Sequence, residues 1–319
     1  MEQSQTVVQD QPVNTSAHHD GLSVPVTYSS EPASIAPQAC TNCGAMPAAA
    51  SSAPATSLSA PASPQWVYAL GRIEARFPSI SVEKEFAQAA GRSETKGLTD
   101  WQTLQAVLSK PENRYLVRQL CWVFSIEGLD TYILAPRDSA DYSLLLDALR
   151  SSPSPSDLDL VIGMKGPMAP SQMCNGLIVP VVIFDQIYPF TREEFFKAMP
   201  KSEKTPQKEY SAAAEELFDR IMQMTDNAGS MNHNRALNYL VVRYLHRISE
   251  AVAEAFARDE SLTAVDVRPS PLSGTRAIVD AIFSFTNRNT DVISKQFVRV
   301  DVTDEFPFLV TRLSPYYDR

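Results

Sequence analysis

Glycine is scarce in this chain, which leaves little material for loops that cradle phosphate groups. Only 11 glycines occur in 319 residues. The sequence has no Gly-x-x-x-x-Gly-Lys loop, no Gly-x-Gly-x-x-Gly turn and no His-Glu-x-x-His helix. These absences exclude the usual sites for nucleotide phosphates, for dinucleotides and for the zinc of a metallopeptidase.

Both halves of a subtilisin-like catalytic triad are also missing. The nucleophile of such enzymes stands in a Gly-Thr-Ser turn, but here Gly274-Thr275 is followed by Arg276. Their base stands in a His-Gly-Thr context, whereas the four histidines of this chain are followed by His19, Asp20, Asn234 and Arg247. The motifs therefore predict no catalytic residue.

Lysine and arginine are absent from residues 1–65, and Ala, Pro and Ser dominate from Met46 to Pro64. Such a composition buries too little apolar surface to offset chain entropy, so we expect a disordered linker at 1–65 and a folded domain at 66–319. The whole chain carries a net charge of −9. An acidic surface argues against nucleic acid or an anionic membrane as a partner.

No run of 18 apolar residues occurs, and the N-terminus lacks the basic start and apolar centre of a signal peptide. We therefore expect a soluble, cytoplasmic protein. In that compartment the 4 cysteines are expected to be thiols or metal ligands, without a disulfide framework.

Cys40 and Cys43 form a Cys-x-x-Cys-Gly motif, which has the geometry of half a tetrahedral zinc site. A closed site needs two more ligands. Cys174 lies in a polar Met-Cys-Asn-Gly loop and suits that role, whereas Cys121 fits a small buried residue of a strand. The other available ligands are His18, His19, His233 and His246. The alternative to a structural zinc is a pair of free thiols in the linker.

The hydrophobic pattern predicts an α+β fold in which amphipathic helices pack on a mainly antiparallel sheet. Helices are expected from Ser81 to Gly91, after the capping boxes at Thr99 and Thr191, and along the stripe Leu237, Val241, Tyr244, Ile248, Val252 and Phe256. The expected strands are 115–126, 131–134, 158–162, 177–184, 263–267, 277–285, 296–302 and 308–313.

Arginine and asparagine are concentrated in two places that are candidates for binding a peptide carboxylate or main-chain amides. One is the stripe of Arg72 and Arg76. The other is the loop of Asn287, Arg288 and Asn289, and Arg276 stands in a turn upstream of it. The alternative is a solvated surface with weak ion pairs. His233 lies in an Asn-rich turn and is a candidate ligand or proton carrier.

Several stretches in one order resemble the C-terminal domain of the PatG/PatA-type cyanobactin maturation proteases. The resemblance runs from Trp66 to Arg319, and its clearest stretches are Tyr68–Ser79, Asn113–Trp122, Met173–Gly176, Phe184–Tyr188, Met222–Gly229, Arg235–Tyr239 and Phe306–Arg319. In the larger proteins of that family the domain follows a subtilisin-like protease, whereas here a polar tail begins at Met1. The resemblance therefore implies the pathway and carries over no protease or macrocyclase activity.

Together, the resemblance and the missing catalytic motifs predict a non-catalytic accessory domain of cyanobactin biosynthesis. Such a domain would dock a precursor peptide or other pathway enzymes. Two alternatives stay open: an unrecognised enzyme that uses His233, Asp280 or Arg288 in a cleft, and a purely structural domain that forms a homodimer.

The zinc hypothesis predicts a simple metal count. If Cys40 and Cys43 bind zinc with help from the folded domain, replacing both with Ser abolishes stoichiometric metal, because two of four ligands are lost. Elemental analysis of the purified chain checks this, and an unchanged zinc content would eliminate both as ligands.

Overall fold

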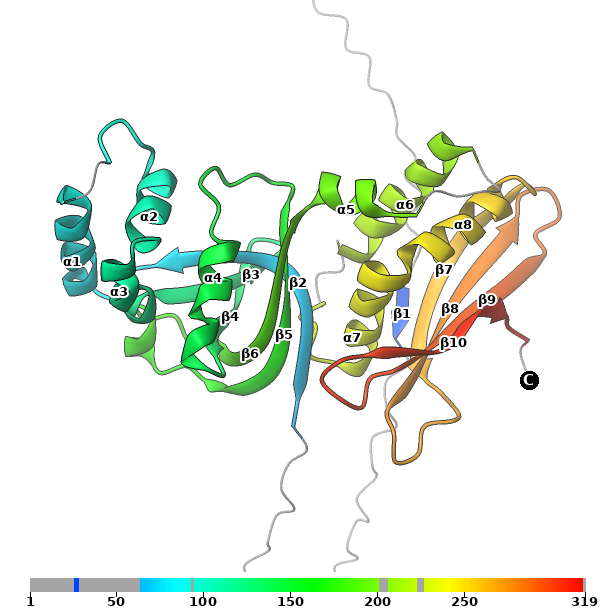
Figure 1. Ribbon diagram of the computed structural model, residues 1–319. Helices are drawn as coiled ribbons and strands as arrows, with labels where there is room; N and C mark the ends of the chain where they lie inside the picture. Colours follow the sequence, from blue (N-terminus) through cyan, green and yellow to red (C-terminus); the bar gives the residue numbers. More distant parts are fainter. Residues whose placement is uncertain (1–25, 29–63, 93–94, 201–205, 223–226, 318–319) are drawn as a thin grey trace, which may run out of the picture.

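Two β-sheets enclose a layer of helices, as the computed structural model in Figure 1 shows. The structure describes residues 26–28, 64–92, 95–200, 206–222 and 227–317. Within them, every strand pair is antiparallel except β4–β6 and β1–β7. The predicted α+β class with a mainly antiparallel arrangement is confirmed.

The first sheet closes into a barrel with the strand order β2-β3-β4-β6-β5. Its strands are β2 (Trp66–Arg76), β3 (Cys121–Ile126), β4 (Leu129–Pro136), β5 (Asp157–Met168) and β6 (Pro180–Thr191). Closure brings β5 and β6 very near each other at Gly163, where an added Cβ would lie 2.3 Å from the carbonyl oxygen of Ile183. A glycine is therefore required at this bulge.

Four helices cover the barrel on the side away from the second sheet: α1 (Ile80–Gly91), α2 (Asp100–Leu108), α3 (Arg114–Gln119) and α4 (Tyr142–Ala148) (Figure 1). Short turns of 3-10 helix, η1 (Pro111–Asn113), η2 (Ser139–Asp141) and η3 (Ser171–Met173), connect these elements. The capping box of Thr99 with Gln102 is confirmed. The cap of α1 is Ser79, because its side chain accepts from the amide of Val82, and the expected cap at Ser81 is wrong.

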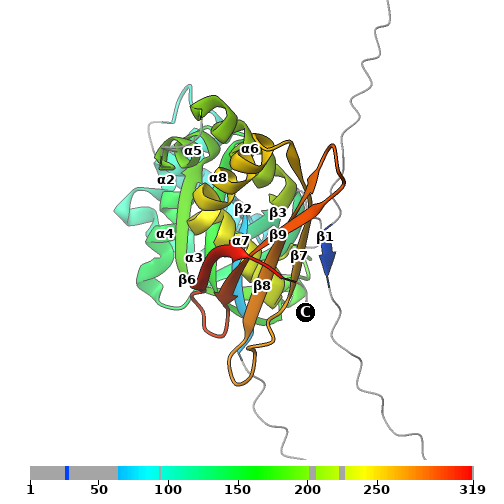
Figure 2. The same ribbon diagram turned by 90° about the vertical axis from the view of Figure 1, so that its right-hand side faces the viewer.

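The second sheet has the order β1-β7-β8-β9-β10. It consists of β7 (Glu260–Pro269), β8 (Ile278–Asn287), β9 (Ile293–Asp301) and β10 (Phe308–Pro315), which confirm the strands expected there, and of β1 (Val26–Tyr28). β1 corrects the expectation that all of residues 1–65 are unstructured, since it pairs with β7 (Figure 2). The other residues of the expected linker up to 63 lie outside the described residues.

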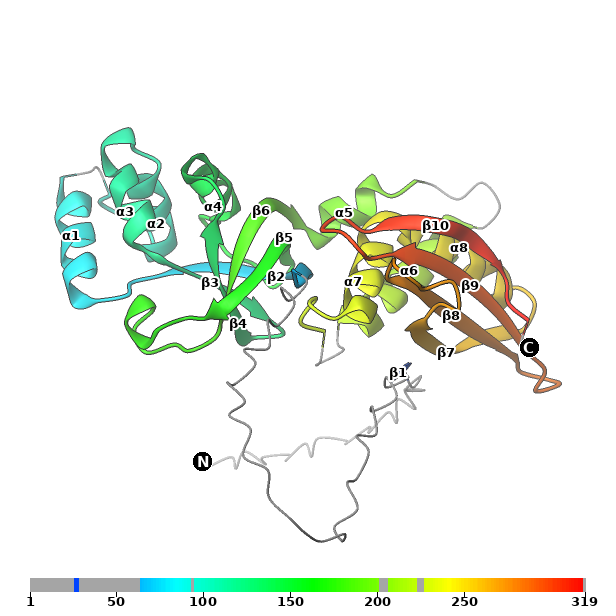
Figure 3. The ribbon, with the colours of Figure 1, turned by 90° about the horizontal axis from the view of Figure 1, so that it is seen from below.

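The helical layer between the sheets comprises α5 (Arg192–Ala198), α6 (Gln207–Met222), α7 (Asn232–Tyr239), the π-helical turn η4 (Leu240–Tyr244) and α8 (Leu245–Phe256). Figure 3 shows this layer from below. The layer joins both sheets in one core that includes Leu70, Phe218, Leu237, Ile248 and Phe283. None of the described helices is long and apolar enough to cross a bilayer.

α7 is fixed to the barrel by a buried amide network. The Asn238 side chain donates to the carbonyl oxygen of Tyr68 at 2.8 Å and exchanges hydrogen bonds with Asn227 at 2.6 and 3.1 Å. Gly229 lies against the same strand with a positive φ of 68°, and its carbonyl accepts from the amide of Tyr68. The start of α7 is thereby held beside the start of β2.

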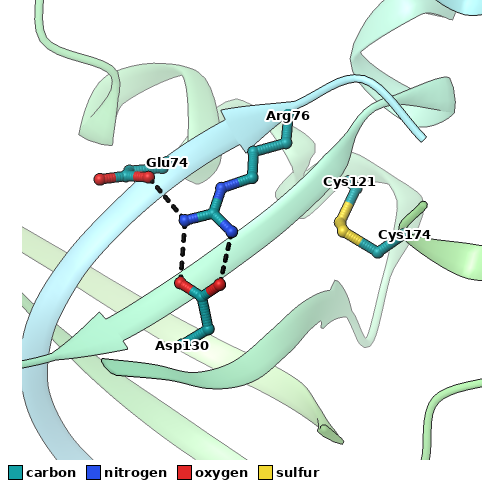
Figure 4. Close-up of a disulfide and its surroundings, with 5 residues drawn as sticks. All are labelled: Glu74, Arg76, Cys121, Asp130 and Cys174. Carbon is teal, nitrogen blue, oxygen red and sulfur yellow. Dashed lines mark hydrogen bonds and ion pairs between the residues drawn. A yellow bond between two sulfur atoms is a disulfide. The ribbon is translucent and has the colours of Figure 1, made fainter. Parts of the chain in front are cut away.

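A disulfide joins Cys121, at the start of β3, to Cys174, just after η3 (Figure 4). The expectation that these two cysteines are thiols or metal ligands is therefore wrong. The bond lies in a small apolar cluster with Val123, Ile133 and Ala169. It fixes the connection between β5 and β6, residues 169–179, to strand β3 of the barrel.

Removing this cross-link should destabilise the protein. The bond spans a sequence separation of 53 residues, so chain entropy alone assigns it up to about 4 kcal/mol. We expect Cys121→Ala with Cys174→Ala to lose about 2–4 kcal/mol of unfolding free energy in urea titrations. Cys40→Ala with Cys43→Ala is the matched control and should leave stability unchanged. A parent protein that unfolds identically with and without reductant would contradict this prediction.

Candidate functional site

A large cleft lies where the barrel, the helical layer and the second sheet meet. It has a volume of about 1000 Å³. Its walls come from the start of β2, the residues that lead into α7, the end of β7 with the following turn, the start of β8, and the chain just after β9. Segments far apart in the sequence therefore form one concave surface, which is the usual setting of a ligand site.

The charged lining of the cleft is entirely basic. Its charged residues are Arg235, Arg268 and Arg276, His233 lines it as well, and no Asp or Glu is among the described lining residues. This charge contrasts with the net −9 of the chain. A basic concave surface on an acidic protein favours an anionic ligand.

Arg276 is held at the cleft by bonds to two carboxylates. Its Nε lies 2.5 Å from Asp301 Oδ2 and its Nη2 lies 3.4 Å from Asp304 Oδ2, while its guanidinium stacks over the Phe308 ring at 5.5 Å. Burial alone would raise the pKa of Asp301, but hydrogen bonds from Arg276 and Thr303 hold it below its ordinary value. The Arg276 side chain is still 46% exposed, so part of its charge faces solvent.

Arg235 is only 2% exposed, and burial lowers its pKa to about 10. Its guanidinium donates to the backbone oxygens of Val302 at 2.5 Å, of Asp304 and of Glu305 at 3.1 Å. Arg235 thus fixes the chain after β9 as one wall of the cleft. Its Nε stays a buried donor without an acceptor among the described residues.

His233 lines the cleft from the first turn of α7. It is half-buried, and this burial lowers its pKa. The residue before α7 is Met231, whose side chain has no strong acceptor for the first amides of the helix. The positive end of the helix dipole adds to the basic character of the cleft.

Behind the cleft, three charged groups clasp the barrel to the second sheet. Arg137, after β4, makes a two-pronged bond to Asp185 on β6, and Asp185 is hydrogen-bonded to Glu305 in the β9–β10 connection. Burial, followed by the bond to Asp185, raises the pKa of Glu305 to about 7. Burial alone would raise the pKa of Asp185, but its bonds to Arg137 and Glu305 lower it.

The predicted residues Arg72 and Arg76 lie on β2, away from the cleft. Arg76 binds both oxygens of Asp130 at 2.6 and 2.8 Å and Glu74 at 2.9 Å (Figure 4). Arg72 donates to the carbonyl oxygen of Pro155 at 2.8 Å. The protein's own carboxylates thus already bind the guanidinium of Arg76.

The predicted loop of Asn287, Arg288 and Asn289 is the turn between β8 and β9, at the start of β7. Asn287 Oδ1 accepts from the amide of Asn289 at 3.0 Å and so shapes the turn. Arg288 donates to Ser261 Oγ at 2.7 Å and stacks over Phe256 at 4.5 Å. Arg288 is exposed, but its contacts support the turn.

The residues of the enzyme hypothesis do not meet. His233 lines the cleft, Asp280 on β8 is bound by Arg299 at 2.7 and 3.1 Å, and Arg288 is at the β8–β9 turn. Likewise, the predicted zinc ligands are not assembled in the described residues. Cys174 is in the disulfide with Cys121, Cys40 and Cys43 lie outside the described residues, and no group of three His, Cys, Asp or Glu there could hold a metal ion.

Two of the cleft residues, His233 and Arg276, were predicted as site residues from the sequence. The other two basic residues, Arg235 and Arg268, were not. Sequence reasoning also missed the clasp at Glu305 and the buried carboxyl of Asp159 on β5. That carboxyl accepts from the amide of Ile73 at 2.9 Å, and burial raises its pKa to about 7. An Asp amid the apolar residues of β5 was the available signal for Asp159. Arg235 opens one of the stretches that resemble the family, but no local pattern indicated the roles of Arg235 and Glu305, because their partners are distant in sequence.

Comparisons with known proteins give one family and one solved structure. The family model described as the PatG Domain matches residues 66–268. The chain is also similar to a solved structure titled "PatG Domain of Unknown Function", with 20% identity and a TM-score of 0.61 over 79% of this chain and 98% of that one. No curated protein matches the chain. At this identity the solved structure supports the fold alone.

The clasp predicts a pH-dependent stability. The folded pKa of Glu305 is about 7 against an ordinary value of 4.5, so the folded state holds a proton that the unfolded state releases, and stability falls as pH rises through this window. Glu305→Gln keeps a neutral side chain at every pH. Its melting temperature relative to the parent should therefore rise by about 2–4 °C from pH 5 to pH 8, which corresponds to about 1 kcal/mol after solvent screening.

Calorimetric scans of both proteins at the two pH values measure this difference. Glu85→Gln, on the exposed side of α1, is the matched control and should show no such change. An equal offset of Glu305→Gln from the parent at pH 5 and pH 8 would show that Glu305 is already ionised in the folded protein.

Proposed function

Because the chain belongs to the PatG domain family, whose model matches residues 66–268, we propose that it is a non-catalytic docking domain for a peptide in cyanobactin biosynthesis. The pathway follows from the resemblance of the sequence to the C-terminal domain of cyanobactin maturation proteases. The observation that supports docking is the cleft of about 1000 Å³ with only basic charges among its described lining residues. The partner we propose is the precursor peptide.

The lining of the cleft has groups that can bind a peptide, and it has few groups that could react with one. The hydroxyl of Ser273 donates to the carbonyl of Ile278 at 2.7 Å and accepts from its amide at 3.0 Å. Thr303 Oγ1 accepts from the amide of Ala277 at 2.8 Å. Both hydroxyls therefore shape the wall of the cleft, and neither is placed as an activated nucleophile.

Carboxylates are the peptide groups that this lining fits. A guanidinium donates charge-assisted hydrogen bonds to a carboxylate, and the nearby start of α7 favours negative charge. Arg268 comes from the end of β7, and Arg276 comes from the connection between β7 and β8, two residues before β8 begins. An acidic peptide segment or a C-terminal carboxylate would find donors from more than one element.

Binding of an acidic peptide should depend on the cleft arginines. We expect an eight-residue synthetic peptide with two Glu and a free C-terminus to bind the full chain in calorimetry. Arg268→Gln with Arg276→Lys should weaken this binding about tenfold, since two guanidinium groups and one positive charge are lost while Asp301 keeps a cationic neighbour. Arg288→Gln, an exposed arginine outside the cleft, is the matched control.

The same peptide with Gln for Glu and a C-terminal amide is the second control and should bind at least tenfold more weakly. Equal binding of the two peptides, or no effect of the cleft variants in protein shown to be folded by circular dichroism, would contradict the docking proposal. A change in peptide mass on incubation that disappears in His233→Ala would replace docking by the enzyme hypothesis.

A further inference from the structure

The open edge of the second sheet already holds an extended segment of this chain. β7 forms that edge, and β1 is added to it in parallel, with Val26 opposite Val265, Thr27 opposite Asp266 and Tyr28 opposite Val267 (Figure 2). All other strand pairs of this sheet are antiparallel and join strands that follow one another along the chain. β1 is therefore an added edge strand, while the other four strands pair in chain order.

β1 uses only the middle of the available edge. The pairing of β7 with β8 is regular from Ala264 to Pro269 and is interrupted by a bulge between Leu262 and Ala264. The bulge limits the edge on one side, and Pro269, which has no amide hydrogen, limits it on the other. A regular strand of about five residues therefore fits, whereas β1 covers the three residues 265–267.

The direction of this edge leads into the cleft. Val267, Arg268 and Pro269 at the end of β7 are lining residues of the cleft. A segment that runs parallel to β7, as β1 does, carries its following residues toward that end. The basic lining would then meet carboxylates that lie C-terminal to the paired stretch.

We propose that the β7 edge is a strand-addition site for an extended segment of a peptide supplied in trans, and that β1 occupies it as a tethered competitor. This deepens the docking function proposed above and rests on it for the occupant being a peptide. Main-chain hydrogen bonds give such a site its affinity. The fitting segment is about five residues long, lacks proline, and is followed by a carboxylate.

The segment between β1 and β2 determines how strongly β1 competes with a peptide supplied in trans. β1 is joined to β2 by residues 29–65, and a linker of such length gives an effective concentration on the order of millimolar. The tether favours β1, but the three residues of β1 make few main-chain hydrogen bonds to β7. A longer segment can therefore displace β1, and loss of β1 should raise the apparent affinity of any competitor.

Two variants of the full chain set the edge open or closed, in a background with Cys40→Ser and Cys43→Ser. The open variant carries Val26→Pro and Thr27→Pro, because proline cannot donate to the ladder. The closed variant carries Thr27→Cys and Asp266→Cys at positions that are register partners, so that a disulfide holds β1 in place. Thr27→Cys alone is the control for the closed variant.

The probe is a labelled synthetic peptide with the sequence of residues 26–31, which lacks proline and ends in Glu31, and its binding is followed by fluorescence polarisation. We expect the open variant to bind it at least tenfold more tightly than the background protein, and the oxidised closed variant at least tenfold more weakly. A probe with proline at the position of Thr27 should bind none of the proteins. Equal affinity of the open and closed variants would overturn the proposal, whatever the circular dichroism of the open variant shows.

The acidic peptide of the preceding section separates this failure from failure of the docking function. If it binds and responds to the cleft arginines, while neither variant changes the binding of the probe, the docking function stands and the edge proposal falls. Light scattering tests a further outcome. A background protein that is a dimer and an open variant that is a monomer would mean that β1 comes from a second copy, which overturns the tethered arrangement.

Discussion

A buried guanidinium needs acceptors, and the backbone carbonyls of residues 302, 304 and 305 supply them for the two terminal nitrogens of Arg235. That requirement determines the path of the chain after β9. It brings Thr303 against Ala277 at the wall of the cleft and Glu305 against Asp185 at the clasp. Because Arg235 and Asn238 lie on the same helix, α7 binds the second sheet through the first residue and the barrel through the second. The geometry of the cleft depends on this one helix.

The clasp shows how the structure limits the cost of buried charge. Two carboxyls, Asp185 and Glu305, face one bidentate arginine, Arg137. Two ionised carboxylates that lie within hydrogen-bonding reach would repel each other. A proton on Glu305 removes this repulsion, while Asp185 keeps its bond to Arg137. The cleft uses the opposite solution, since its carboxylates Asp301 and Asp304 stand behind Arg276 and leave the lining basic.

Local patterns predicted what depends on near neighbours. The strands from 260 onward and the capping boxes at Thr99 and Thr191 are confirmed, because periodicity and caps involve contacts within a few residues. Tyr115 was expected in a strand from 115 to 126, but it lies on α3, and the strand starts only at Cys121. The predicted apolar stripe is buried at Leu237, Val241 and Ile248, whereas Phe256 at its end is 54% exposed. The disulfide, the amide network of Asn238 and the bonds of Arg76 join distant segments, and no spacing in the sequence encodes them.

The family model does not cover all the residues that line the cleft. The family model ends at residue 268, one residue before the end of β7, whereas Arg276 and Thr303, on one side of the cleft, come after it. The match to the solved PatG domain covers a larger share of the chain, which shows that the fold likeness is not confined to residues 66–268. At 20% identity, that likeness carries the path of the backbone and says nothing of the cleft's arginines. Family membership therefore explains why a barrel and a helical layer are present, while the charge of the cleft and the open edge of β7 are properties of this sequence and must be tested on it.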